Sequence, residues 1–186
     1  MLPKLIIMKQ IAYNAFFQNS LTTIIAPHGV TDIVHATSRN KIHSLISTYT
    51  GTFCLGEVFH YCNLPQVNNA LFLIASVIHF RHDIRAIIPK QYENLSFLGS
   101  TGLVYAFSQD PLITFFSYML LVHVPNHYRM AWGYLQNKLP QTLLLLSVTS
   151  IVSQYLFSLK LDDHFIQMMM SIVIGHVVYE EKEIHS

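Results

Sequence analysis

Long apolar windows dominate the hydrophobic pattern of this chain. The clearest contain no Asp, Glu, Lys or Arg and cover residues 58–80, 111–128 and 139–159. Weaker windows cover residues 5–27, 42–61, 95–109 and 164–179. A helix that crosses a bilayer needs about 20 mostly apolar residues. The pattern therefore predicts an all-α, polytopic transmembrane bundle of about seven helices, or six if the polar side chains in the first window prevent a helix there.

Proline marks the boundaries between these windows. The residue before a proline is pushed out of the helical region, so Pro65 predicts a break between two spans near Asn63. Pro111 and Pro140 mark helix starts in the same way, because proline is tolerated in a first helical turn. Seven spans of about 20 residues use about 140 residues. We therefore predict a single transmembrane domain over residues 1–186, with no room for a separate soluble domain.

The composition supports a membrane protein and excludes other classes. Hydrophobic residues make up 52% of the chain and charged residues 11%, whereas a soluble domain has about 25% charged residues. The formal net charge is +1, which does not favour nucleic acid as a partner. Cys54 and Cys62 both lie in apolar sequence and do not form a disulfide framework. We therefore expect membrane lipid to surround the protein.

The distribution of basic residues predicts the orientation in the membrane. In a seven-helix topology, eight basic residues fall on one side and three on the other. The smaller group is Lys4, Lys9 and Lys160, and the larger is Arg39, Lys41, Arg81, Arg85, Lys90, Arg129, Lys138 and Lys182. Because Lys and Arg are enriched in cytoplasmic loops, we expect a multi-pass cell-membrane protein with its N-terminus outside and its C-terminus cytoplasmic.

Histidine is unusually frequent: the chain has eleven, as many as Lys and Arg together. Four segments concentrate the most informative ones, and these are His28 with Asp32, His79 with Asp83, His123 with His127, and His176. In the predicted topology the segments lie at the ends of the first, third, fifth and seventh helices. Alternate helices end on the same side of a membrane, so all four segments reach one level in the cytoplasmic half of the bundle.

The residue types in these segments suit a metal site. Ionisable groups inside a bilayer are costly and usually serve a function in the bundle interior. Neutral imidazole binds Fe, Zn, Cu and Ni, and His123 and His127 share one helix face because they are four residues apart. Pro125 between them removes a backbone hydrogen bond and should disturb the helix. Asp32 and Asp83 each lie four residues after a histidine, where a carboxylate can orient a ligand ring.

A different reading applies to a histidine considered by itself. One histidine in an apolar helix often only forms a hydrogen bond at a helix interface, and we expect His60, His164 and His185 to be packing or surface residues. We do not expect His35, His43 or His82 to be ligands. The metal hypothesis therefore depends on the convergence of the four segments.

The succession P-H-G-x-x-D, H-F-x-x-D, H-x-P-x-H and a late histidine in an apolar helix resembles the Brp/Blh family. Members of this family are integral-membrane β-carotene 15,15′-dioxygenases found alongside microbial rhodopsins. The resemblance implies a non-haem Fe(II), held by four histidines, that splits the central double bond of β-carotene with dioxygen to give two all-trans-retinal molecules. It also implies a carotenoid substrate taken from the bilayer and a functional link to a retinal-binding rhodopsin.

Transferred position by position, the iron ligands of the family fall on His28, His79, His123 and His127. The late histidine corresponds to His176, which we place with Asp32 and Asp83 among the candidates for the layer around the ligands. The chain departs from the family in one respect, because the segment between His79 and His123 is much shorter than usual. This difference concerns the substrate tunnel more than the metal site.

Two other functions remain open from the sequence. A di-iron membrane hydroxylase or desaturase also uses histidine boxes, but it needs about eight ligand histidines and His-His pairs, and this chain has no such pair. A non-enzymatic metal or proton transporter would spread its histidines over the membrane depth, whereas here they lie at one level. No G-x-G-x-x-G motif for a nucleotide or flavin occurs, and a dioxygenase needs no such reductant.

Overall fold

The computed structural model describes residues 29–109, 114–158 and 163–183, and these ranges are helical with no strand. The all-α prediction is therefore confirmed. The α-helices are α2 (Val30–Ser38), α3 (Ile42–Tyr61), α4 (Pro65–Ile87), α5 (Leu95–Gln109), α6 (Phe116–Tyr118), α7 (Val124–Leu135), α8 (Leu139–Ser158) and α9 (Asp163–Glu183). Shorter segments are the 3-10 helices η3 (Lys90–Tyr92) and η6 (Gln136–Lys138) and the π-helix η5 (Met119–His123).

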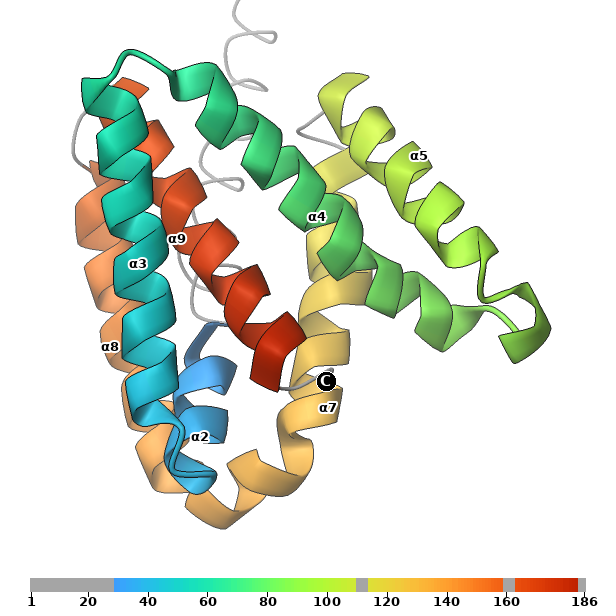
Figure 1. The fold of residues 1–186 in the computed structure, drawn as a ribbon. Coiled ribbons are helices and arrows are strands. Elements are labelled where there is room, and N and C mark those ends of the chain that lie inside the picture. The colour runs from blue at the N-terminus through green and yellow to red at the C-terminus, as the bar shows by residue number, and fades with distance from the viewer. Residues whose placement is uncertain (1–28, 110–113, 159–162, 184–186) are drawn as a thin grey trace, which may run out of the picture.

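Helix α9 lies at the centre of the described structure, between α3 and α4 (Figure 1). Helix α5 packs on α4, and α2 packs against α7, α3 and α8. Elements that are far apart in sequence therefore meet around α9. This arrangement brings the second half of α4, the start of α7 and the second half of α9 into one region.

The predicted break near Pro65 is confirmed. Helix α3 ends at Tyr61 and α4 begins at Pro65, whose missing N–H costs nothing in a first helical turn. Asn63 in the turn has φ 54°, a left-handed conformation that Asn tolerates better than most residues. The predicted end at residue 80 is wrong, because α4 continues to Ile87 and its polar last turns still pack against α9.

Helix α2 was not predicted, since its residues were assigned to a loop. Val30 and Val34, one turn apart, are buried in a cluster with Leu135 of α7, so tertiary packing stabilises a helix too short to be stable alone. The predicted helix over residues 5–27 lies outside the described residues.

Pro125 disturbs its helix as expected, and the disturbance takes the form of the π-helix η5. Residues 119–123 are wound more widely than an α-helix, and the Val124 N–H bonds the Met119 carbonyl, five residues back. Proline has no N–H to donate to the carbonyl of the preceding turn. A π-helical turn is one way for a helix to accommodate the missing hydrogen bond. The π-helix η5 ends at His123, so the wider winding sets the direction of that side chain.

Charged and polar side chains connect the α2–α3 junction to the end of α9. Lys41 pairs with Glu183 at 3.3 Å, and the Ser44 hydroxyl donates to Glu183 at 2.6 Å. This hydrogen bond lowers the pKa of the Glu183 carboxyl, because it stabilises the charged form. Lys182 donates to Ser44 at 3.2 Å. The same end therefore gathers basic residues that the orientation prediction placed on one side.

Among the helices of the described ranges, none combines the length and the apolar character that crossing a bilayer requires.

Close contact between α3 and α9 depends on small residues. A Cβ at Gly56 of α3 would lie 2.8 Å from the Ser171 Cβ of α9. Asn68 of α4 donates to the Ser171 hydroxyl at 3.2 Å and to the Gln167 carbonyl at 3.0 Å, so it joins the third helix to the pair. Gly51 of α3, by contrast, faces open space.

Replacing Gly56 with alanine should destabilise the protein. We expect Gly56→Ala to lower the free energy of unfolding by about 1–2 kcal/mol, because overpacking costs about 1–3 kcal/mol and improved helix propensity returns up to about 1 kcal/mol. The matched control Gly51→Ala, on the same helix, should gain up to about 1 kcal/mol. Chemical unfolding followed by circular dichroism measures both. Equal effects from the two variants would contradict the close α3–α9 packing.

Candidate metal centre

Four buried histidines from four elements come together beside α9. They are His79 of α4, His123 of η5, His127 of α7 and His176 of α9, and one ligand atom from each lies within 4.8 Å of the others. Each of these residues is at most 7% exposed. Such a group of donor atoms could hold a metal ion.

Three of the four histidines predicted as ligands belong to this cluster: His79, His123 and His127. The fourth, His28, lies outside the described residues. His176 was expected in the layer around the ligands, but it lies among the donors themselves. Its position on the central helix, facing α4 and α7, explains why the sequence pattern could not distinguish the two roles.

The spacing of the ring nitrogens fits a coordinated ion. The Nε2 atoms of His79 and His123 are 3.2 Å apart. Two ligands bound at about 2.1 Å and at right angles would be about 3.0 Å apart, and two opposite ligands about 4.2 Å. The 3.2 Å separation of these two nitrogens is close to the first of these values.

A carboxylate orients each of two rings from behind. Asp83 accepts from the Nδ1 of His123 at 2.7 Å, and Asp32 accepts from the Nδ1 of His176 at 2.7 Å. In a neutral imidazole whose Nδ1 carries the proton, Nε2 has the lone pair that binds metal. These contacts are the carboxylate–histidine–metal arrangement typical of protein metal sites.

The partner of Asp83 differs from the sequence expectation. The i, i+4 spacing paired Asp83 with His79, but the structure pairs it with His123. Asp32 pairs with His176, and His28, which the spacing assigned to Asp32, lies outside the described residues. In both pairs the ring comes from a facing element, η5 for Asp83 and α9 for Asp32.

Three further side chains fix the two aspartates. Tyr118 donates to Asp83 at 2.7 Å, and Asn126 donates to its other oxygen at 2.6 Å. Tyr49 donates to Asp32 at 2.6 Å. No pattern in the sequence indicates these roles, because each donor is far from its aspartate along the chain.

Glu180 is the central residue that sequence reasoning missed. It is 2% exposed and lies one turn after His176 on α9. Its Oε1 is 3.1 Å from His127 Nδ1, and its Oε2 is 3.3 Å from His79 Nδ1 and 3.7 Å from His176 Nε2. With Asp32 and His176 it forms a second group that could hold a cation. The i, i+4 spacing of His176 and Glu180 was the available signal.

The histidines that we expected to be packing or surface residues lie elsewhere. His60 stacks on His164 with ring centroids 4.2 Å apart, and His164 contacts Glu57 at 3.0 Å. His35 contacts the Tyr179 hydroxyl at 3.3 Å, and burial lowers the pKa of its ring. His185 lies outside the described residues.

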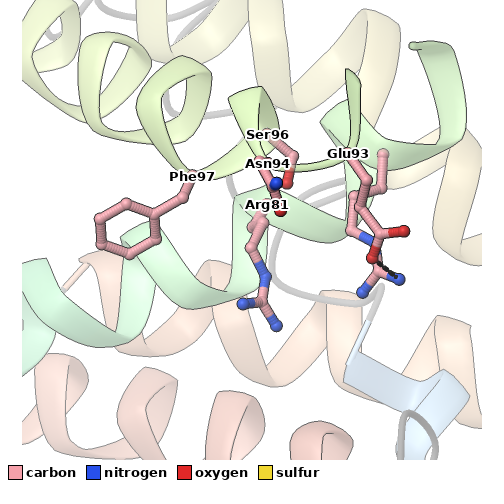
Figure 2. Close-up of a pocket in the computed structure, with 6 residues that line it drawn as sticks. Arg81, Glu93, Asn94, Ser96 and Phe97 are labelled. Atoms are coloured by element: carbon pink, nitrogen blue, oxygen red, sulfur yellow. Dashed lines mark ion pairs between the residues drawn. The ribbon is translucent and has the colours of Figure 1, made fainter. Parts of the chain in front are cut away.

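A separate basic pocket lies between the last turns of α4 and the start of α5 (Figure 2). It is lined by Arg81, Arg85, Glu93, Asn94, Ser96 and Phe97. Arg85 forms an ion pair with Glu93. No histidine lines this pocket, so it does not compete with the buried cluster as a metal centre.

Comparisons of the chain with protein-family models, curated proteins and solved structures find no match. The resemblance to the Brp/Blh family therefore stays a prediction based on the motifs themselves.

Loss of a donor ring should abolish metal binding. We expect His123→Ala to lower the affinity for iron(II) by at least about 100-fold, because its ring contacts both the cluster and Asp83. The control His60→Ala should bind like the wild type, since its ring stacks on His164 outside the cluster. Anaerobic equilibrium dialysis with metal analysis measures both. Unchanged iron content in His123→Ala would exclude this ring as a ligand.

Proposed function

We propose that this protein is an integral-membrane, non-haem iron dioxygenase that cleaves the central 15,15′ double bond of β-carotene to give two retinals. The observation that carries the proposal is the buried cluster of His79, His123, His127 and His176 with carboxylates behind the rings. Imidazole nitrogen suits Fe, and the Brp/Blh-like motifs favour iron over Zn, Cu or Ni. His28 remains a candidate ligand from those motifs.

The donor set fits a mononuclear ferrous ion. The four neutral rings would hold the ion, and six-coordinate iron would keep two positions for exogenous ligands. When bound, the iron would supply the dioxygen activation that the cleavage requires. The protein's own residues exclude water by burial and hold the rings in place, with Asp83 fixing His123 and Asp32 fixing His176.

The distribution of polarity supports a lipid environment. Helix α8 exposes an apolar stripe at three- and four-residue spacing, in which each side chain is at least 44% exposed: Leu139, Leu143, Leu144, Val148, Ile151, Val152 and Tyr155. The interior, in contrast, buries Asp32, Asp83 and Glu180. A soluble monomer rarely exposes large apolar patches, whereas a membrane protein places ionisable groups inside and apolar groups against lipid. We include in the proposal the orientation with a cytoplasmic C-terminus.

An apolar groove supports a hydrocarbon substrate. It runs between α4 and α9 and is lined by Leu71, Ile74, Ala75, Ile78, Ile174, Val177, Val178, Glu181 and Lys182. Ala75 lies one turn before His79, and Val177 directly follows His176. The groove therefore follows the two helices that carry metal donors, and a polyene from the bilayer would lie along it.

The products fit a cell that contains a retinal-binding rhodopsin. One β-carotene and one dioxygen give two retinals, so both oxygen atoms enter the products and no external electrons are needed. The proposed partners are accordingly the carotenoid, dioxygen, membrane lipid and a rhodopsin that takes up retinal.

One observation favours a second candidate function, a di-iron membrane hydroxylase. Asp32, His176 and Glu180 form a cation-binding group that overlaps the histidine cluster, and two adjacent ions would suit hydroxylation. A hydroxylase would leave the carbon skeleton intact and would require electrons from another protein.

The product of the reaction decides between these functions. Full-length protein in detergent, loaded with iron(II) and incubated with β-carotene and air, should form two retinals for each β-carotene consumed. The His123→Ala variant should form none, because its donor set is incomplete. Chromatography with mass detection identifies the products. Hydroxylated C40 carotenoids in a parallel reaction that also contains a reductant would favour the hydroxylase, and iron binding without any turnover in either reaction would exclude both enzymes.

A bulky side chain in the groove should weaken substrate binding. We expect Ile74→Trp to raise KM about tenfold, or roughly 1.4 kcal/mol, with iron content unchanged, because Ile74 lines the groove. The control Leu73→Trp changes a similarly exposed neighbour outside the groove and should leave KM unchanged. Steady-state kinetics with β-carotene measures both. The same KM in the two variants would contradict this substrate site.

A further inference from the structure

We propose that the basic pocket between α4 and α5 binds the phosphate group of an anionic membrane lipid. The pocket is formed by Arg81, Arg85, Glu93, Asn94, Ser96 and Phe97 (Figure 2). This inference rests on the lipid environment that belongs to the proposed function, but not on the iron or on the carotenoid reaction.

The charges of the pocket leave one arginine without a counterion. Arg81 and Arg85 lie one turn apart on α4, so their side chains share one face of the helix. Glu93 pairs with Arg85, and within the described ranges Arg81 has no ion pair. Two guanidinium groups and one carboxylate give the pocket a net charge of +1, which favours an anionic ligand.

A buried nitrogen of Arg81 points to the same kind of ligand. Its Nε is buried and has no hydrogen-bond partner in the part of the chain that the structure describes. Buried donors in native proteins are nearly always satisfied by protein, water or an ion, so this nitrogen suits an acceptor that a ligand brings. The guanidinium holds its donors in a planar fork that matches two oxygens of a phosphate group. In Figure 2, Arg81 projects between Phe97 and Glu93.

The size of the pocket suits one phosphate group. Its volume is about 180 Å³. Pockets that enclose whole small molecules begin at about 300 Å³. The Asn94 amide and the Ser96 hydroxyl line the pocket beside Arg81 and can donate hydrogen bonds to an anion. The pocket therefore fits a phosphate whose remaining part lies outside it.

The surface beside the pocket is apolar and favours a lipid over free phosphate. At the end of α4 and the start of α5, four side chains are each at least 54% exposed: Ile87, Leu95, Phe97 and Leu98. A diacyl lipid offers a phosphate to the arginines and hydrocarbon to these side chains, whereas inorganic phosphate uses only the pocket. Arg81 and Arg85 also belong to the basic majority predicted on the cytoplasmic side, where anionic lipids are concentrated.

Lipid binding by the full-length protein in a neutral detergent tests this inference, with dioleoylphosphatidylglycerol as the probe. Arg81→Gln should lower the affinity about tenfold, because it removes the charge and the fork that hold the phosphate. The matched control Arg39→Gln removes the same charge from an exposed arginine that contacts Tyr134 outside the pocket, and it should bind like the wild type. Native mass spectrometry measures both. Wild-type affinity in Arg81→Gln, or equal losses in the two variants, would overturn the inference.

Removal of the competing carboxylate should have the opposite effect. Glu93→Gln frees Arg85 from its ion pair, so the affinity for the lipid should rise a few-fold. Glu93 is exposed, so this variant keeps the inference testable if Arg81→Gln does not fold. An unchanged or lower affinity in Glu93→Gln speaks against the site.

Two further probes identify the source of the phosphate. Dioleoylglycerol has the same chains without the phosphate, and its binding should be weaker than that of the phospholipid and should not depend on Arg81. Inorganic phosphate should compete with the lipid only at much higher concentration, because it makes no contact with the apolar side chains. Inorganic phosphate that binds as tightly as the lipid would indicate a site for free phosphate and overturn the assignment to a lipid.

Iron analysis of the same samples separates this inference from the proposed function. Arg81→Gln should keep the iron content of the wild type, because Arg81 is not part of the histidine cluster. A wild-type protein that binds no iron contradicts the metal centre, and the difference between Arg81→Gln and Arg39→Gln still tests the lipid site.

Discussion

Three carboxylates buried beside four histidines are the constraint on which this structure depends. Asp32, Asp83 and Glu180 are each at most 3% exposed. A buried charge without compensation is very costly, so such groups occur where they are hydrogen-bonded, paired or close to a cation. Hydroxyl and amide donors satisfy part of this need at the two aspartates. A divalent ion among the rings would add positive charge beside these carboxylates.

The central position of α9 follows from the same constraint. This helix carries His176 and Glu180 and packs against both α3 and α4. Gly56 on α3 permits the close approach on one side, and on the other His79 reaches the Glu180 carboxylate. The site and the fold are thus not independent, because the helix that completes the donor set also holds the bundle together.

Buried ionisable groups and exposed apolar side chains occur together in the described structure. The interior contains the ionisable cluster beside apolar clusters, and the outer face of α8 is apolar. Contact of this face with lipid or with another apolar surface would be favourable, because it removes the side chains from water. The groove between α4 and α9 is lined mainly by apolar side chains of the two helices that carry His79 and His176.

The sequence by itself determined the helical class, the break at Pro65, the disturbance at Pro125 and the choice of His79, His123 and His127 as candidate ligands. These features depend on local chemistry: apolar runs, the missing proline N–H, and residues one turn apart on a face. Only the tertiary structure decided that His176 joins the donors, that Asp83 orients His123, and that Glu180 lies between two rings. The physical reason is that these contacts cross between helices, whose rotation and register are set by packing and are not encoded in the spacing along any one helix.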